Sequence, residues 1–196
     1  MGPLEWKAYL QSCSRQIIED GDDAGGPTLP EAVIQSGWLG YESASRSAIQ
    51  QAETRLGLPL PPSLCLFYSV TNGWRTVGSF IYEVPPVEKV GWLSESNFNL
   101  YEIGLGVEAQ YGSDPRPDLR EFAYEGGTRV KRSLAVSVWG DASTWLLDPL
   151  TVSAKGEWSG GRWSSWNLGM EWIAESFEQL FRDEYETYLR LRAEEQ

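Results

Sequence analysis

The chain of 196 residues is 41% hydrophobic and 13% aromatic, contains 10 Trp, and has a formal net charge of −12 without any His. This length and hydrophobic content predict one folded domain with a substantial core, and the lack of His excludes imidazole bases and most zinc sites. No apolar run approaches the roughly 20 residues of a membrane helix, and the first residues lack the pattern of an export signal, so we expect a cytoplasmic protein with no membrane partner.

An amphipathic helix is predicted over residues 4–19. The following stretch, residues 20–27, reads "DGDDAGGP" and breaks the helical pattern. We therefore divide the chain into an N-terminal helix with a flexible connector, residues 1–26, and a main domain, residues 27–196. The helix is indicated by four apolar residues at helical spacing: Trp6, Leu10, Cys13 and Ile17.

A helical hairpin is predicted near the start of the main domain. Ser45 is a typical N-cap for its first helix, and Gly57 provides the left-handed stop. Its second helix begins at Pro61, because proline is tolerated in a first turn, and ends at Asn72-Gly73, two residues that adopt positive φ readily.

From residue 79 the hydrophobic period changes to that of strands. The bursts "SFIYEV", "LYEIGL" and "LREFAYE" predict three of them, and a hairpin joins residues 134–139 to 144–147 across a turn that contains Asp141. Ser176 begins the last helix with a capping box. The fold class is therefore α+β, a mixed, mostly antiparallel sheet with an N-terminal helical hairpin and a C-terminal helix packed on it.

The stretch "AETRLGLPLPPSLCLFYSVTNGW", residues 52–74, together with "TWLLDP" and the terminal helix, resembles the SUKH superfamily, which includes the Smi/Knr-type regulators of fungal cell-wall assembly. The resemblance implies that bacterial members of this kind are immunity proteins, which bind and neutralise polymorphic toxins and are not enzymes. We assign a structural role to the residues that carry it: Glu53, Leu56, Gly57, Leu60, Pro61, Phe67, Asn72, Gly73 and Asp148.

Aromatic residues are the candidates for a partner-binding surface, because Trp is enriched at binding hot spots. Trp158, Trp163 and Trp166 occur among Gly and Ser in a stretch that we interpret as an exposed loop. Trp163 is the preferred contact, because Gly160, Gly161 and Arg162 predict an exposed polar setting. Three further residues complete the candidate set: Arg162, Tyr41 and Asp141.

We expect no catalytic, cofactor-binding or metal-binding residues. Asp141 and Asp148 are separated by roughly 15 to 20 Å along a strand, whereas a glycosidase pair lies about 5 to 10 Å apart. Cys13 and Cys65 have no metal-like spacing, and we expect both to be free thiols.

The negative charge is concentrated in three segments and favours a basic partner over nucleic acid. Residues 1–31 have six acids and two bases, residues 79–110 five and one, and residues 171–196 eight and three, whereas only residues 111–132 lean basic. We expect a non-catalytic immunity protein that binds a basic toxin domain. The alternatives are a carbohydrate-binding or wall-metabolism protein with a Trp platform, and a regulatory scaffold like the fungal relatives.

Overall fold

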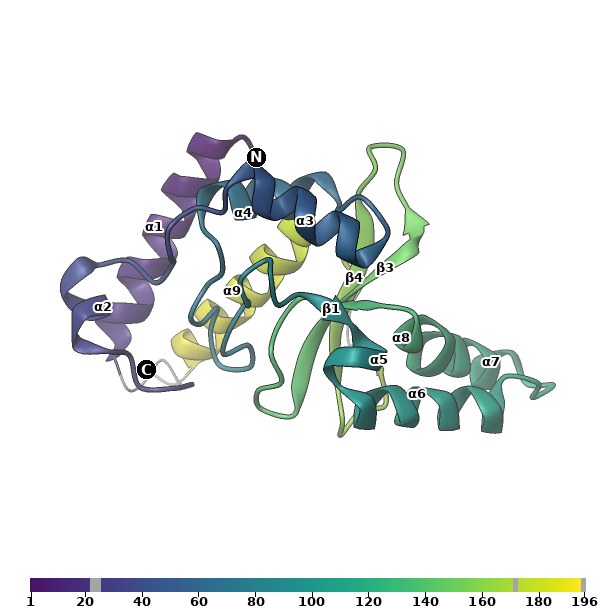
Figure 1. Ribbon diagram of the computed structural model, residues 1–196. Helices are drawn as coiled ribbons and strands as arrows, with labels where there is room; N and C mark the ends of the chain where they lie inside the picture. The colour runs from purple at the N-terminus through teal and green to yellow at the C-terminus, as the bar shows by residue number, and fades with distance from the viewer. Residues whose placement is uncertain (22–25, 171–172, 195–196) are drawn as a thin grey trace.

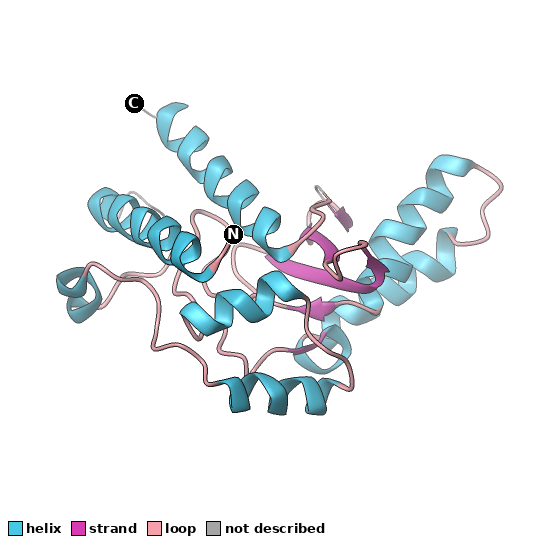
Figure 2. Cartoon of the chain, turned by 90° about the horizontal axis from the view of Figure 1, so that it is seen from above, coloured by secondary structure: helices cyan, strands magenta, loops and turns pink. Residues whose placement is uncertain are grey.

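The computed structural model describes residues 1–21, 26–170 and 173–194, and its centre is one antiparallel sheet of strand order β1-β2-β3-β4-β5 (Figure 1). Helices cover both faces of the sheet (Figure 2). In chain order the elements are α1 (Pro3–Asp20), α2 (Glu31–Ser36), α3 (Arg46–Leu56), α4 (Pro62–Val70), β1 (Gly91–Trp92), α5 (Leu93–Ser96), α6 (Phe98–Tyr111), α7 (Pro117–Ala123), the π-helical turn η2 (Tyr124–Thr128), α8 (Arg129–Lys131), β2 (Leu134–Ala135), β3 (Ser143–Val152), β4 (Trp158–Ser164), β5 (Gly169–Met170) and α9 (Phe177–Glu194). The predicted α+β class is confirmed.

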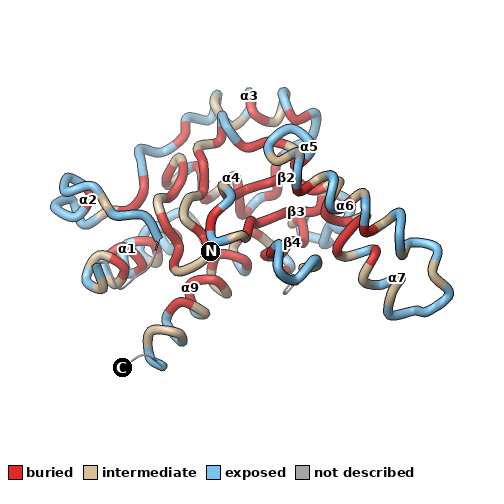
Figure 3. The backbone as a smooth tube through the Cα atoms, turned by 90° about the horizontal axis from the view of Figure 1, so that it is seen from below, coloured by how far each residue is buried: buried red, intermediate tan, exposed pale blue. Residues whose placement is uncertain are grey.

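The sheet separates two apolar clusters because side chains alternate between its faces. On one face, Trp145 and Leu147 pack with residues of α1, α4 and α9. On the other face, Leu146 and Trp163 pack with residues of α5, α6 and α8. The strands and the helices next to them contain most of the buried backbone in Figure 3, whereas α2 and the far ends of α6 and α7 are largely exposed.

The first helix is part of the main core, although we separated it from the main domain at residue 26. Trp6 is fully buried, with its ring centroid 5.6 Å from that of Phe67 in α4 and 5.7 Å from that of Phe181 in α9. Tyr188 of α9 donates a hydrogen bond to Asp20 at the other end of α1. Residues 22–25 of the connector lie outside the described part of the chain.

Most of the predicted helix signals are present in the helices around this core, but α4 ends at Val70 with an extended Thr71, before the predicted stop at Asn72-Gly73. Ser45 Oγ accepts a hydrogen bond from the Ala48 amide at 3.1 Å, and Gly57 closes α3 with φ of 76°. Ser176 Oγ accepts from the Gln179 amide at 3.1 Å at the start of α9. Both cysteines are free thiols, and burial raises the pKa of each to about 12.

The strands predicted for "LYEIGL" and "LREFAYE" are wrong, because these residues lie in α6, α7 and the start of η2. Glycine is needed here for close helix packing: a Cβ at Gly127 would lie 2.8 Å from the Glu108 amide and 2.9 Å from the Gly104 carbonyl oxygen. The third predicted strand, "SFIYEV", is also wrong, since only Val84 forms a bridge, to Trp74. We call residues 93–131 the helical arm.

Asp148 joins the helical arm to the sheet, because Arg129 of the arm lies with its Nε 3.7 Å from the Asp148 carboxylate. Its carboxylate is fully buried and accepts hydrogen bonds from Arg132 at 2.9 and 2.6 Å, from Thr151 Oγ1 at 2.7 Å and from the Leu150 amide at 3.0 Å. Burial alone would raise the pKa of Asp148, but these donors lower it below its usual value. The structural role that we assigned to Asp148 is consistent with this network.

Among the helices of the described segments, none combines the length and the apolar character that crossing a bilayer requires.

Candidate functional site

The interpretation of residues 158–164 as an exposed loop is wrong, because they form β4 in the interior of the sheet. Trp158 and Trp163 are buried, and Trp163 is 0% exposed. Gly160 serves close strand packing rather than loop flexibility, since a Cβ there would collide with the Leu146 carbonyl oxygen of β3. The preferred contact residue, Trp163, therefore belongs to the core.

Arg162 is also buried, and its interactions are internal. Its guanidinium donates to Glu184 of α9 at 3.2 Å and lies 4.2 Å from the ring centroid of Phe80. The indole Nε1 of Trp145 donates to the same carboxylate at 3.3 Å. A buried charge without its partner costs several kcal/mol, so Arg162 holds α9 to the sheet instead of facing a partner.

Three of the predicted contact residues remain accessible. Trp166 is 65% exposed and Tyr41 is 39% exposed. Asp141 is exposed in the hairpin turn, where its φ of 43° and that of Ala142, 54°, reverse the chain. The Ser165 amide donates to the Ala142 carbonyl at 2.9 Å, so the turn with Trp166 lies beside the turn with Asp141.

The residues of the family-like motif are structural in their contacts. Glu53 accepts a hydrogen bond from the Leu60 amide at 3.0 Å, and Asn72 Oδ1 accepts from the Val87 amide at 2.9 Å. Gly73 has φ of 108°, and a Cβ there would lie 2.8 Å from the Val84 carbonyl oxygen. The apolar members are buried: Leu56, Leu60 and Phe67. Pro61 is the N-cap of α4.

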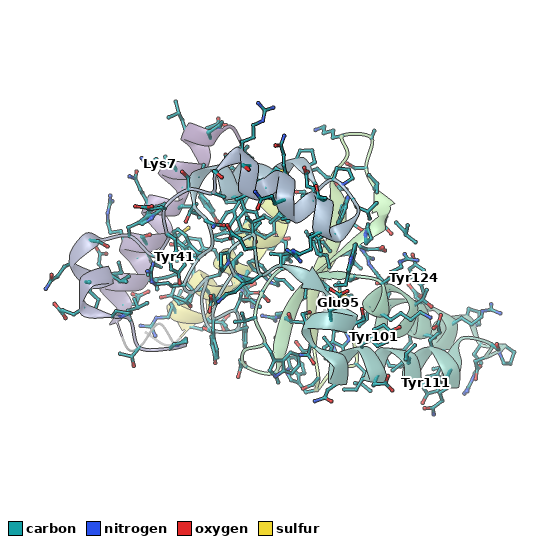
Figure 4. All side chains as sticks on the ribbon, in the orientation of Figure 1. Lys7, Tyr41, Glu95, Tyr101, Tyr111 and Tyr124 are labelled. Carbon is teal, nitrogen blue, oxygen red and sulfur yellow. The ribbon has the colours of Figure 1, made fainter. Side chains whose placement is uncertain are left out.

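A first hollow, of about 220 Å³, lies beside Tyr41, which is labelled in Figure 4. The guanidinium of Arg75 lies 4.0 Å from the Tyr41 ring centroid and donates to the carbonyl oxygens of Leu39 and Gly40, at 2.9 and 2.6 Å. Arg75 therefore holds the tyrosine ring in place. The lining residues are Pro27, Thr28, Leu29, Pro30, Tyr41, Arg75, Tyr82 and Glu83.

A second hollow, of about 270 Å³, adjoins the first at Glu83 and contains Trp139, which is 43% exposed. The Trp139 ring centroid lies 6.1 Å from that of the buried Trp163, which supports it from within the protein. Lys89 and Asn97 also line this hollow. The sequence analysis did not identify Trp139 or Arg75 as functional.

Strand register explains how the floor of the second hollow forms. Ala135 of β2 pairs with Leu146 of β3, and beyond the end of β2 the Ser137 hydroxyl lies 3.3 Å from the Thr144 hydroxyl of β3. Ala135, Ser137, Trp139 and Thr144 all line the hollow. The strand predicted over residues 134–139 places residues 135, 137 and 139 on one face, although β2 itself ends at Ala135.

Tyr82, which lines the first hollow, connects that hollow to the hairpin turn. A Cβ at Gly140 would lie 2.5 Å from the Tyr82 ring, so the ring packs directly on the turn next to Asp141. Partial burial and the Asp141 charge raise the pKa of Tyr82. We define the aromatic face as Tyr41, Arg75, Tyr82, Glu83, Lys89, Trp139 and Asp141.

The charged side chains of the aromatic face differ in whether they already interact with other groups of the protein. Arg75 is bound to main-chain oxygens and to Tyr41. Within the described part of the chain, neither Glu83 nor Lys89 takes part in an ion pair. These two side chains can therefore engage a ligand without first breaking a salt bridge.

The basic segment of the sequence is occupied by internal pairs. Arg129 lies 3.2 Å from Glu125, Arg132 pairs with Asp148, and Lys131 pairs with Glu108.

No group of three or more Cys, Asp or Glu side chains suited to a metal ion occurs among residues 1–21, 26–170 and 173–194. The chain matches no family model, no curated protein and no solved structure.

Proposed function

We propose that the chain is a non-catalytic binding protein of the immunity type, which neutralises a basic toxin domain by covering it with the aromatic face. The observation that supports this most is the pair of partly exposed aromatic side chains, Tyr41 and Trp139, beside two hollows that meet at Glu83. Aromatic anchors of this kind carry much of the binding energy in protein interfaces.

Both anchors are held in place before any partner arrives. Arg75 lies against the Tyr41 ring, and Trp163 lies against the Trp139 ring. A side chain that is already ordered loses less conformational entropy on binding, so more of the contact energy appears as affinity. A stable complex needs about 1,200 to 2,000 Å² of buried surface, which requires contacts beyond the two hollows.

The charge of the chain supports a basic partner. The net charge of −12 creates a field that attracts cationic proteins over long distances. Much of the positive charge in the basic segment is paired internally, as in Arg129, Lys131 and Arg132. The attraction for a basic partner therefore comes from the charge of the whole chain, because the aromatic face itself has two acidic and two basic side chains.

A Trp platform for carbohydrate is the second candidate function. Trp139 shares its hollow with the Ser137 and Thr144 hydroxyls and the Asn97 amide, and hydrogen-bonding groups beside an aromatic ring are what a sugar requires. This candidate uses the same residues, so the experiment must separate the two.

The test is whether the protein binds a basic toxin domain from a neighbouring gene and protects growth against it. Trp139→Ala removes one anchor and should weaken binding by about 2 kcal/mol, roughly thirtyfold, and reduce protection. Trp166→Ala is the matched control, because Trp166 is exposed outside both hollows. The proposal fails if Trp139→Ala protects as well as the unchanged protein. Quenching of Trp fluorescence by oligosaccharides that is lost in Trp139→Ala would instead support the carbohydrate platform.

Salt dependence tests the role of the net charge. The Debye length contracts from about 10 Å at 0.1 M to about 3 Å at 1 M salt. We expect the association rate with the basic toxin domain to fall as salt rises, measured by stopped-flow fluorescence. An association rate that does not change with salt would contradict electrostatic steering, but it would not contradict binding through the aromatic face.

A further inference from the structure

The Trp139 hollow places a carboxylate beside an aromatic ring. Glu83 and Trp139 both line it, and Asp141 lies in the turn that follows Trp139. Glu83 is the one acidic and Lys89 the one basic side chain among the lining residues. An aromatic ring beside a carboxylate favours a cationic ligand over a neutral or anionic one.

The protein uses arginine on an aromatic ring repeatedly inside its own fold. Arg75 lies 4.0 Å from the ring centroid of Tyr41, and Arg162 lies 4.2 Å from that of Phe80 while it also pairs with Glu184. The second case combines a ring and a carboxylate on one guanidinium. Trp139 and Glu83 offer the same two groups at the surface, and the described chain provides no ion-pair partner for Glu83.

We propose that the Trp139 hollow is a receptor for an arginine side chain, with the guanidinium stacked on the Trp139 indole and paired with the Glu83 carboxylate. The source of that arginine rests on the proposed function, since a basic partner protein would present it. The occupant is arginine rather than lysine, because a planar guanidinium stacks on an indole and binds a carboxylate through two N–H groups. A hollow of about 270 Å³ is large enough for one such side chain.

Lys89 has a distinct effect in this arrangement. Lys89 lines the same hollow, and its positive charge repels an incoming guanidinium. Removal of the Lys89 charge should therefore tighten binding, while removal of the Glu83 charge should weaken it. A purely structural role for these residues would not produce opposite signs.

The experiment is an NMR titration of the isolated protein with N-acetylarginine amide. The indole N–H signal of Trp139 is assigned from its loss in Trp139→Phe. The control ligand, N-acetylcitrulline amide, has nearly the same shape without the charge, and both titrations are run at one ionic strength. We expect arginine to shift the Trp139 signal with a millimolar dissociation constant and citrulline to bind several-fold more weakly.

Two charge variants complete the test. Glu83→Gln should weaken arginine binding by about fivefold and Lys89→Gln should tighten it by about twofold, as expected for partly exposed charges. The Glu83 backbone carbonyl, which accepts from the Val138 amide at 3.0 Å, is unchanged in Glu83→Gln, so the fold should be retained and the melting temperature checks this.

The proposal is overturned if citrulline binds as well as arginine, if arginine at tens of millimolar leaves the Trp139 signal unmoved, or if Glu83→Gln binds as tightly as the unchanged protein. Failure of the proposed function is distinguishable. If arginine binds at Trp139 while Trp139→Ala still protects against the toxin domain, the cation site stands and the toxin-binding face is wrong. If protection is lost but arginine does not bind, the reverse holds.

Discussion

Asp148 shows how one buried carboxylate depends on its donors. Its side chain is fully buried, and Arg132, Thr151 and the Leu150 amide together offset the loss of water. Removing one partner of a buried ion pair costs about 3 to 5 kcal/mol, because the remaining charge stays buried without compensation. The stability that Asp148 contributes therefore depends on all of these donors together.

We predict that Asp148→Asn lowers the free energy of unfolding at pH 7 by about 3 kcal/mol, measured by urea denaturation. The pKa of Asp148 is lowered in the folded protein, so its contribution is complete above the ordinary value of 3.8 and is lost as the pH falls through the lower folded value. The difference between the two proteins should therefore shrink below about pH 4. A difference that grew on acidification would show that the sign of the pKa shift is wrong.

The same substitution, Trp to Ala, should affect stability very differently at a buried and at an exposed position. Trp163→Ala should cost about 3 to 5 kcal/mol of stability, because it empties a packed site between Trp139 and the helical arm. Trp166→Ala should change stability by less than about 0.5 kcal/mol, because Trp166 is 65% exposed. Thermal unfolding of both variants measures the contrast, and equal melting temperatures would contradict the burial of Trp163.

The same residues show which properties of single side chains could be predicted from the sequence. Glycines around Trp163 are typical of loops, and nothing local reveals that Gly160 allows β3 to approach β4. Asp141 was placed correctly in its turn, because turn chemistry is local. Trp139 was missed because its exposure depends on where the strand leaves the sheet, which only the tertiary fold decides.

At the scale of elements, helices with local end signals were predicted well and the helical arm was not. The caps at Ser45, Gly57 and Ser176 act within a few residues. In α6, Gly104 and Gly106 lower helix propensity, so the residues around them resemble a strand interrupted by glycine. Tertiary contacts stabilise this helix, and those contacts are not visible in a local pattern.

Substitution of two glycines of the helical arm by alanine should change the stability of the protein in opposite directions. Gly127→Ala should destabilise the protein by about 1 to 3 kcal/mol, because its Cβ would press on backbone atoms of Glu108 and Gly104. Gly106→Ala should stabilise it by about 0.5 to 1 kcal/mol, since no neighbour lies within 4 Å of the added Cβ and alanine favours a helix. Chemical denaturation of both variants measures the two signs. Stabilisation by Gly127→Ala would contradict the close packing of η2 on α6.

At the scale of the whole molecule, α1 and α9 enclose one core together with the sheet. Trp6 contacts aromatic rings from α4 and α9, so residues far apart in the chain depend on the same packing. A boundary at residue 26 was inferred because the connector is rich in glycine and aspartate. Composition describes the connector, but it does not determine what the helix before it packs against.

We therefore predict a single cooperative unfolding transition in which α1 takes part. Trp6→Ala should lower the free energy of unfolding by about 3 to 5 kcal/mol, because it leaves a cavity beside Phe67 and Phe181. Circular dichroism and Trp fluorescence should give coincident curves in both proteins. Two separate transitions in the unchanged protein would show that α1 is an independent unit.

The helical arm leaves and rejoins the sheet at one place. β1 and β2 are antiparallel neighbours, and the Leu93 amide donates to the Ser133 carbonyl at 3.0 Å across the base of the arm. A segment inserted between two paired strands changes neither their register nor their order. The entropic cost of closing such a loop rises only slowly with its length. The arm is therefore an insertion in a hairpin, and its tip near residues 112–116 is the point where a reporter domain can be grafted while the sheet and the aromatic face keep their geometry.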